Sequence, residues 1–248
     1  MKSYNLLSID ETGKASYKHP SQLFIVSGVL IPERLKKKID SETRKIKKKY
    51  FKNPDIVFHT RDMIRAKGQF ANLKDQAVAV NFWTEFTTII NNPAINLFFI
   101  ITNKEHAKKA GWQSHTILEK MYIKLLEGFI QQLMVSNSYG KILLESDPAQ
   151  DTYLIKAHNR LQSIGTTDKR VDAKEYRTRV TSLSLVNKEN LDIDIQIADA
   201  LAPIAGLKYQ IDILKLTKKP NTLEQMKLDI INKKIIDKKN LSLFEVLI

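Results

Sequence analysis

Three acidic residues occupy positions where a strand end or an apolar helix would hold them on a rigid support. Asp10 ends an apolar run near the N-terminus, and Glu145 ends the run KILLE at residues 141–145. Asp199 lies inside residues 195–202, which are otherwise almost entirely apolar. An ionised carboxylate buried alone in such a helix costs several kcal/mol, so Asp199 must be neutral, paired or metal-bound. Each acid also has a structural interpretation, as a turn cap, a partner of a lysine or an acceptor for a backbone amide.

Carboxylates that converge from separate elements form a site suited to hard divalent cations. The chain contains no cysteine, so a metal would need oxygen or imidazole ligands. Mg²⁺ and Mn²⁺ prefer oxygen ligands. Two such ions about 4 Å apart can activate water and neutralise the charge that develops during phosphodiester hydrolysis. The acids therefore predict Mg²⁺ or Mn²⁺ as cofactor, with Glu11, Asp147 and Asp194 as reserve ligands.

The elements that position these acids can be predicted from hydrophobic periodicity. Strands are expected at residues 4–10, 23–31, 55–59, 95–102, 141–145 and 180–186, the last one at a sheet edge. The first two strands should form an antiparallel hairpin, and period two places Asp10 and Glu11 on opposite faces of the first. Helices are expected at residues 32–50, 73–90, 114–135, 153–164, 194–209 with an interruption at Pro203, and from 222 to about 239.

A hairpin followed by alternating helices and strands indicates an α/β fold with a mixed sheet flanked by helices. No segment has the composition of a linker, so residues 1–248 should form one domain. Residues 210–248 should form a helical extension, opened by a capping box at Thr222 and Gln225. This C-terminal helix and the apolar tail 241–248 are candidates for contact with a second copy or a protein partner.

The net charge of +13 favours a polyanionic partner such as RNA or DNA. The helix at 32–50 should turn a basic face outward, on which Arg34, Lys38 and Lys47 also lie. The candidate phosphate contacts on that face are Lys36, Lys37, Arg44, Lys45, Lys48 and Lys49. An ordinary solvated helix face is the competing interpretation. The highly charged residues 168–179 are expected to form an exposed loop that could contact substrate.

Two motifs resemble those of a large uncharacterised family that is regarded as ribonuclease-H-like. The first is Ser8-Ile9-Asp10-Glu11-Thr12-Gly13 followed by a buried strand, and the second is Gln196-Ile197-Ala198-Asp199 followed by Ala200-Leu201-Ala202. Family members begin with an Ile-Asp-Glu-Ser-Gly strand and finish with a Leu-Gln-Leu-Ala-Asp-Leu-Ile-Ala-Gly helix. The resemblance extends from the first strand to about Tyr209. It implies a ribonuclease-H-like fold, Asp10 and Asp199 as metal ligands, and Glu145 in place of the acid on the central strand.

The sequence departs from the family pattern at His59. Family members often carry an acid two residues before this histidine, and Val57 stands there instead. Under a two-metal scheme Asp10 would bridge both ions, and Glu145 and Asp199 would bind one each. His59 would then orient water or assist the leaving group, although the missing acid leaves its role open.

These observations predict a metal-dependent nuclease acting on RNA or DNA, in a host-defence or mobile-element setting as the resemblance suggests. Two alternatives stay open: a catalytically inactive nucleic-acid-binding module, and a protein-interaction subunit that uses the C-terminal helix. The apolar run before Asp10 is too short for a signal peptide, and no segment reaches the roughly 20 apolar residues of a membrane span. We therefore expect a soluble cytoplasmic protein with no membrane partner.

Overall fold

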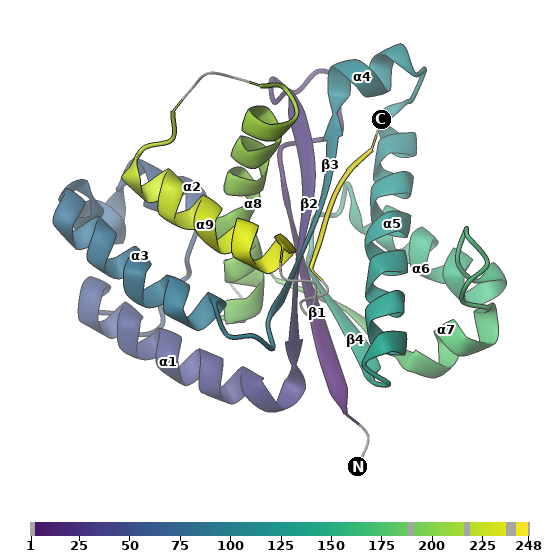
Figure 1. Ribbon diagram of the computed structural model, residues 1–248, viewed down its shortest axis with the longest axis horizontal. Helices are drawn as coiled ribbons and strands as arrows, with labels where there is room; N and C mark the ends of the chain where they lie inside the picture. Colours follow the sequence, from purple (N-terminus) through teal and green to yellow (C-terminus); the bar gives the residue numbers. More distant parts are fainter. Residues whose placement is uncertain (1–2, 188–190, 216–218, 237–241, 248) are drawn as a thin grey trace.

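The computed structural model describes residues 3–187, 191–215, 219–236 and 242–247, which form an α/β fold around a six-stranded mixed sheet (Figure 1). The strands are β1 (Tyr4–Thr12), β2 (Leu23–Pro32), β3 (Asn96–Asn103), β4 (Tyr139–Glu145), β5 (Val180–Val186) and β6 (Leu243–Leu247). Their order across the sheet is β5-β4-β1-β2-β3-β6. The strand β2 is antiparallel to β1 and β3, whereas β4 is parallel to β1, β5 to β4, and β6 to β3. The predicted hairpin, mixed sheet and edge position of β5 are confirmed.

Helices cover both faces of the sheet (Figure 1). One layer contains α1 (Glu33–Phe51), α2 (Thr60–Arg65), the 3₁₀ helix η1 (Gly68–Lys74), α3 (Gln76–Ile90), α8 (Ile193–Asp212) and α9 (Thr222–Ile236). The other contains α4 (Lys104–Lys109), α5 (Ser114–Val135), α6 (Asp151–Ile164) and α7 (Ala173–Arg179). Because both faces are covered, the inner strands are apolar on both sides, and a separate hydrophobic core lies on each.

The first strand divides its side chains between these two cores. Leu6 belongs to the core under α8, whereas Leu7 and Ile9 belong to the core under α5. The same alternation directs Asp10 toward α8 and Glu11 toward α5, as the period of a strand requires. The first β-strand therefore supplies acids to both sides of the sheet at its carboxyl end.

The helix α8 lies close to β1 and β2 through a stripe of small residues. Ala198, Ala202 and Ala205 are fully buried at spacings of four and three residues, which place them on one face of the helix. Pro203 does not interrupt α8, which continues to Asp212. The short alanine side chains allow the helix to carry Asp199 near the end of β1.

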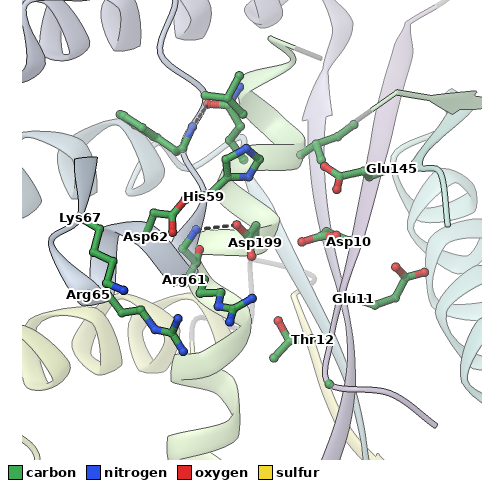
Figure 2. A pocket seen from close by; sticks show the side chains of 16 residues that line it. Asp10, Glu11, Thr12, His59, Arg61, Asp62, Arg65, Lys67, Glu145 and Asp199 are labelled. Carbon is green, nitrogen blue, oxygen red and sulfur yellow. Dashed lines mark hydrogen bonds between the residues drawn. The ribbon is translucent and has the colours of Figure 1, made fainter. Parts of the chain in front are cut away.

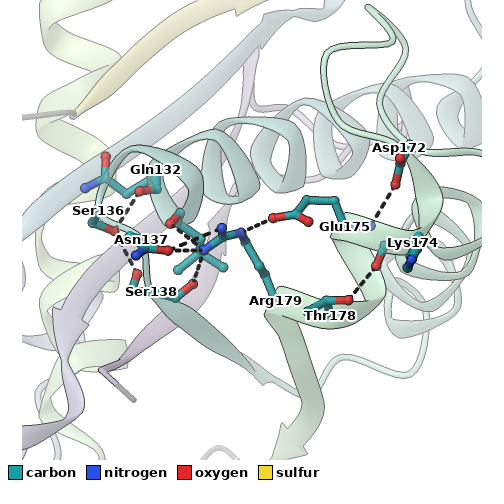
Figure 3. A network of polar contacts seen from close by, with 10 residues as sticks. Gln132, Ser136, Asn137, Ser138, Asp172, Lys174, Glu175, Thr178 and Arg179 are labelled. Atoms are coloured by element: carbon teal, nitrogen blue, oxygen red, sulfur yellow. Dashed lines mark hydrogen bonds and ion pairs between the residues drawn. The ribbon is translucent and has the colours of Figure 1, made fainter. Parts of the chain in front are cut away.

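Two segments differ from their predicted structure. Residues 55–59 form no strand but an irregular connection, in which the Phe58 amide bonds to Gln196 of α8 rather than to a neighbouring strand, and the Thr60 amide just after it bonds to Asp199. Residues 173–179 form α7 rather than part of a loop. Asp172 caps this helix by accepting from the Glu175 amide, and Arg179 donates to the Ser138 carbonyl at 3.1 Å (Figure 3).

The C-terminal region also differs from the expected helical extension. The helix α9 packs on α3, and the apolar tail then adds β6 to the sheet beside β3. The Leu97 amide donates to the Ser242 hydroxyl at 2.9 Å just before that strand. Residues 237–239, which were expected to end the helix, and residues 241 and 248 of the tail lie outside the described residues. The tail segment 243–247 is thus engaged within its own domain.

In the described parts of the chain, every helix is too short or too polar to cross a membrane.

Candidate active site

A cavity of about 720 Å³ lies at the carboxyl ends of β1 and β4 and brings together three of the predicted acids and a fourth, reserve acid (Figure 2). Its acidic wall holds Asp10 and Glu11 from β1, Glu145 from β4 and Asp199 from α8. The opposite wall is formed by residues 57–62, 65 and 67, which include His59. Acids from the front, the middle and the rear of the sequence thus lie around one cavity.

Asp10 is the centre of the acidic wall. Its side chain is buried, with the residue only 9% exposed. Burial raises the pKa of its carboxyl group well above the usual range, and the neighbouring carboxylates of Asp199, Glu11 and Glu145 raise it further. All four acids are therefore close enough for their charges to repel, and a cation among them would relieve that repulsion.

Asp199 is held by the segment that faces it. Its Oδ2 atom accepts the backbone N–H of Thr60 at 2.8 Å (Figure 2). Burial raises the pKa of the Asp199 carboxyl group, and the hydrogen bond from the Thr60 amide opposes that rise. The amide fixes one carboxylate oxygen in place.

Gln196 lies one turn before Asp199 on α8 and contacts the same segment. Its Oε1 atom accepts the Phe58 backbone N–H at 3.0 Å and the Lys47 ammonium at 2.9 Å. The ammonium group also lies 4.6 Å from the centroid of the Phe58 ring. Burial lowers the pKa of Lys47 to about 8. The glutamine of the second sequence motif thus ties together α1, α8 and the segment before α2.

Glu11 has a partner on the other side of the sheet. The Tyr122 hydroxyl group of α5 donates a hydrogen bond to its carboxylate. Burial raises the pKa of Glu11 to about 7, and the hydrogen bond from Tyr122 lowers it against that trend. Glu11 lines the cavity with Asp10, yet it is anchored from the α5 side, as its position on β1 predicts.

The other reserve acids do not line the cavity. Asp194 is fully buried and accepts from the Ser8 hydroxyl at 2.5 Å and from the Lys36 ammonium at 3.1 Å. Asp147 accepts the Ala149 amide and the Gln150 side chain in the turn after β4. Their oxygens already accept hydrogen bonds from these partners, and neither residue is among those that line the cavity.

The predicted basic face of α1 is only partly present. Lys36 pairs with Asp192 and Asp194, Arg44 with Asp55 at 2.6 Å, and Lys49 with Glu85. Lys47 is 3% exposed and points inward, so its assignment to the outward face was wrong. Lys37, Lys45 and Lys48 are exposed as predicted. Lys36 and Lys47 turn toward α8 because α1 packs on that helix. There Asp194 accepts a hydrogen bond from Lys36, and Gln196 accepts one from Lys47.

Sequence reasoning missed the basic residues of the cavity wall opposite the acids. Arg61, Arg65 and Lys67 line the cavity and are exposed, and Asp62 lies among them (Figure 2). The available signal was the run of basic residues that follows His59 at positions 61, 65 and 67. Because residues 55–59 were predicted to form a strand, the basic residues after them were not recognised as part of the site.

The donor set fits a hard divalent cation in its chemistry. It offers only carboxylate oxygens plus one imidazole, and its central acid is destabilised in the ionised form by three neighbouring acids. As the side chains stand, no three histidine or carboxylate groups among the described residues are grouped tightly enough to hold one metal ion. Asp10, Glu11, Glu145 and Asp199 are the residues at the cavity that could supply oxygen ligands to such an ion.

No protein-family model, curated protein or solved structure matches this chain.

Proposed function

We propose that this protein is a metal-dependent nuclease of ribonuclease-H-like fold that hydrolyses phosphodiester bonds of RNA or DNA. The observation that carries the proposal is the position of Asp10, buried near the carboxyl end of β1 and close to Glu11, Glu145 and Asp199 at one cavity. Four repelling carboxylates are costly to keep together without a cation. A divalent cation held among them would offset this repulsion and would account for their convergence from β1, β4 and α8.

The sheet topology supports the fold assignment. Read from its other edge, the strand order is β6-β3-β2-β1-β4-β5, which contains the ribonuclease H order 3-2-1-4-5. The antiparallel β1, β2 and β3 and the parallel β1, β4 and β5 are consistent with this reading. In this proposal β6 is an added strand at the outer edge of β3.

Asp10, Glu145 and Asp199 would hold the metal, with Glu11 in reserve. Bound Mg²⁺ or Mn²⁺ supplies activation of water and neutralisation of charge on the phosphate. The chain's own contribution is positional. The Thr60 amide holds Asp199, the Tyr122 hydroxyl holds Glu11, and the backbone around His59 is fixed to α8. The His59 imidazole, exposed at the cavity wall, can exchange a proton with water or with the leaving oxygen.

The proposal is tested by incubating labelled RNA and DNA with the full chain in Mg²⁺ or Mn²⁺ and in chelator. We expect metal-dependent cleavage that falls at least about 100-fold in Asp10→Asn, since loss of even a group that supports a metal ligand costs about 10–100-fold. Asp212→Asn is the matched control, because Asp212 lies on α8 outside the cavity and pairs with Lys208 at the surface. Cleavage that is equal in all three proteins, or unaffected by chelator, would refute the assignment.

A catalytically inactive nucleic-acid-binding module is the second candidate. Two observations favour it: the net charge of +13, and carboxylates that are not already gathered as a ligand set within the described residues. This candidate predicts binding that weakens steeply with salt and persists in Asp10→Asn, with no metal-dependent cleavage by the wild-type chain.

A further inference from the structure

The cavity has walls of opposite charge, and the basic wall has no function so far. Arg61, Arg65 and Lys67 project from α2 and the residue pair after it, across the cavity from Asp10 and Asp199 (Figure 2). Between them they offer three cations, with the single carboxylate of Asp62 among them, to a space whose other side carries four carboxylates. A phosphate group entering the cavity would be repelled by the acids and attracted by this wall.

These three cations are exposed and uncommitted, unlike much of the basic face of α1. Over the ranges that the structure describes, Arg61, Arg65 and Lys67 form no side-chain hydrogen bond and no ion pair within 4.0 Å. On α1, by contrast, Lys36, Arg44 and Lys49 are paired with acids, and none of the α1 residues lines the cavity. Paired lysines lose much of their attraction for a phosphate, because the carboxylate partner must first be displaced.

The wall is also held in a fixed position. The Phe58 and Thr60 amides bond to Gln196 and Asp199 of α8, and Met63 packs into the core beneath α2. The helix α2 ends at Arg65, and the next residue, Ala66, has a φ of +46° that turns the chain so that Lys67 lines the cavity. Short, anchored backbone carries the guanidinium groups, and arginine suits phosphate because its donors form a planar fork.

We propose that Arg61, Arg65 and Lys67 form the phosphate-binding wall that positions the backbone of a nucleic-acid strand against the acidic cluster, in place of the basic face of α1. This inference rests on the proposed nuclease function, which supplies the polyanionic substrate. The strand crosses the cavity between α2 and the end of β1, and its contacts with the wall are made to phosphates and not to bases. Binding is therefore salt-dependent and tolerant of sequence.

The test compares two double variants of equal charge change in the full-length chain carrying Asp10→Asn, so that the probe is not consumed. One removes two cations from the wall, Arg61→Gln with Arg65→Gln, and the other removes two exposed cations from α1, Lys37→Gln with Lys45→Gln. The probes are fluorescent 12-nucleotide RNA and DNA single strands in Mg²⁺, titrated from about 50 to 200 mM salt. Circular dichroism melting verifies that each variant is folded.

We expect the wall variant to weaken binding about 10-fold or more and to reduce the slope of log K against log salt by roughly one per lost contact. The α1 variant should change affinity less than about 3-fold. Equal losses in the two variants, a larger loss in the α1 variant, or absence of binding by the parent chain would overturn the inference.

Failure of the nuclease proposal would look different. If the wall variant alone loses binding while the chain with Asp10 intact cleaves nothing in Mg²⁺ or Mn²⁺, the wall stands and the proposed catalysis falls. If the chain with Asp10 intact cleaves, and adding the wall substitutions to it leaves cleavage and the binding constant unchanged, the catalysis stands and the wall falls.

Discussion

Gln196 and Asp199 stand three residues apart on α8 and accept the backbone N–H groups of Phe58 and Thr60, at 3.0 and 2.8 Å. Residues i and i+3 of a helix lie on one face, and alternate amides of an extended chain point the same way. The spacing of the two acceptors on α8 matches the spacing of the two amides. The Gln196 and Asp199 side chains therefore accept the hydrogen bonds that a neighbouring strand would otherwise accept. The amides they hold flank His59, whose side chain is thereby left to face the cavity.

Replacing Gln196 should reveal the strength of this attachment. In Gln196→Leu the Phe58 N–H and the buried Lys47 ammonium both lose their acceptor, so we expect a loss of about 2–4 kcal/mol in the free energy of unfolding. Gln196→Glu keeps an acceptor oxygen for both donors and should retain most of the stability. Urea unfolding of both variants measures the difference. A change below about 0.5 kcal/mol in Gln196→Leu would show that water replaces the glutamine.

The attachment explains why residues 55–59 could not be assigned from sequence. An apolar pair before a histidine has the composition of a short strand, and the backbone is indeed extended at His59. What distinguishes it from a strand is the identity of its hydrogen-bond partners, which come from a helix about 140 residues later. Local periodicity contains no information about such partners.

Other parts of the fold and of the site also divide into features that the local sequence could predict and features that depend on distant partners. The end of β4 at Glu145 and the place of Asp199 on a buried helix were predictable, because buried apolar runs that carry an acid have few alternative structures, whereas β1 continues two residues past its predicted end, to Thr12. The strand β6 was not, because five residues are assigned only by their pairing with β3. The cap of α7 was a local signal that was overlooked, since Asp172 precedes Glu175 by three residues. The inward turn of Lys47 depends on Gln196 and could not be read from α1 alone.

Metal binding should stabilise the folded chain through the acidic cluster. We expect Mg²⁺ or Mn²⁺ at about 100 times its Kd to add about 2.7 kcal/mol and to raise the melting temperature. At a metal concentration held equal to that used at pH 8, the effect should be smaller at pH 5.5, because burial and like charges raise the pKa of Asp10 and protons compete with the metal. Differential scanning calorimetry of wild type and of Asp10→Asn measures it, with Asp212→Asn as control. An equal shift in Asp10→Asn would place the metal elsewhere.

The burial of Lys227 should make stability increase with pH in the alkaline range. Its ammonium lies 3.5 Å from the centroid of the Trp83 ring, and within the described residues it has no ion pair or hydrogen bond. Burial lowers its pKa from 10.5 to about 8. The folded chain thus releases this proton before the unfolded chain does, and the cost of the buried charge is present in full below pH 8.

That cost is relieved as pH rises from about 8 to about 10.5, by at most about 3 kcal/mol. Urea unfolding at pH 7, 8, 9 and 10 should therefore show wild type gaining stability relative to Lys227→Met. The comparison cancels other titrating groups, since the methionine keeps the apolar stem and removes only the charge. Parallel curves for the two proteins would mean that the ammonium reaches water.

A substitution of His59 should change the rate of cleavage without changing the stability of the fold. His59 is the N-cap residue of α2, but its side chain makes no capping hydrogen bond, and it is exposed at the cavity. We therefore expect His59→Gln to leave the melting temperature and the metal-induced stabilisation nearly unchanged. If the imidazole transfers a proton in the reaction, metal-dependent cleavage should fall about 10²–10⁴-fold. The matched control is His115→Gln, an exposed histidine at the start of α5, outside this cavity. The measurement is the initial rate of cleavage at saturating metal. A loss below about 3-fold in His59→Gln would mean that water alone transfers the proton and that His59 only lines the cavity wall.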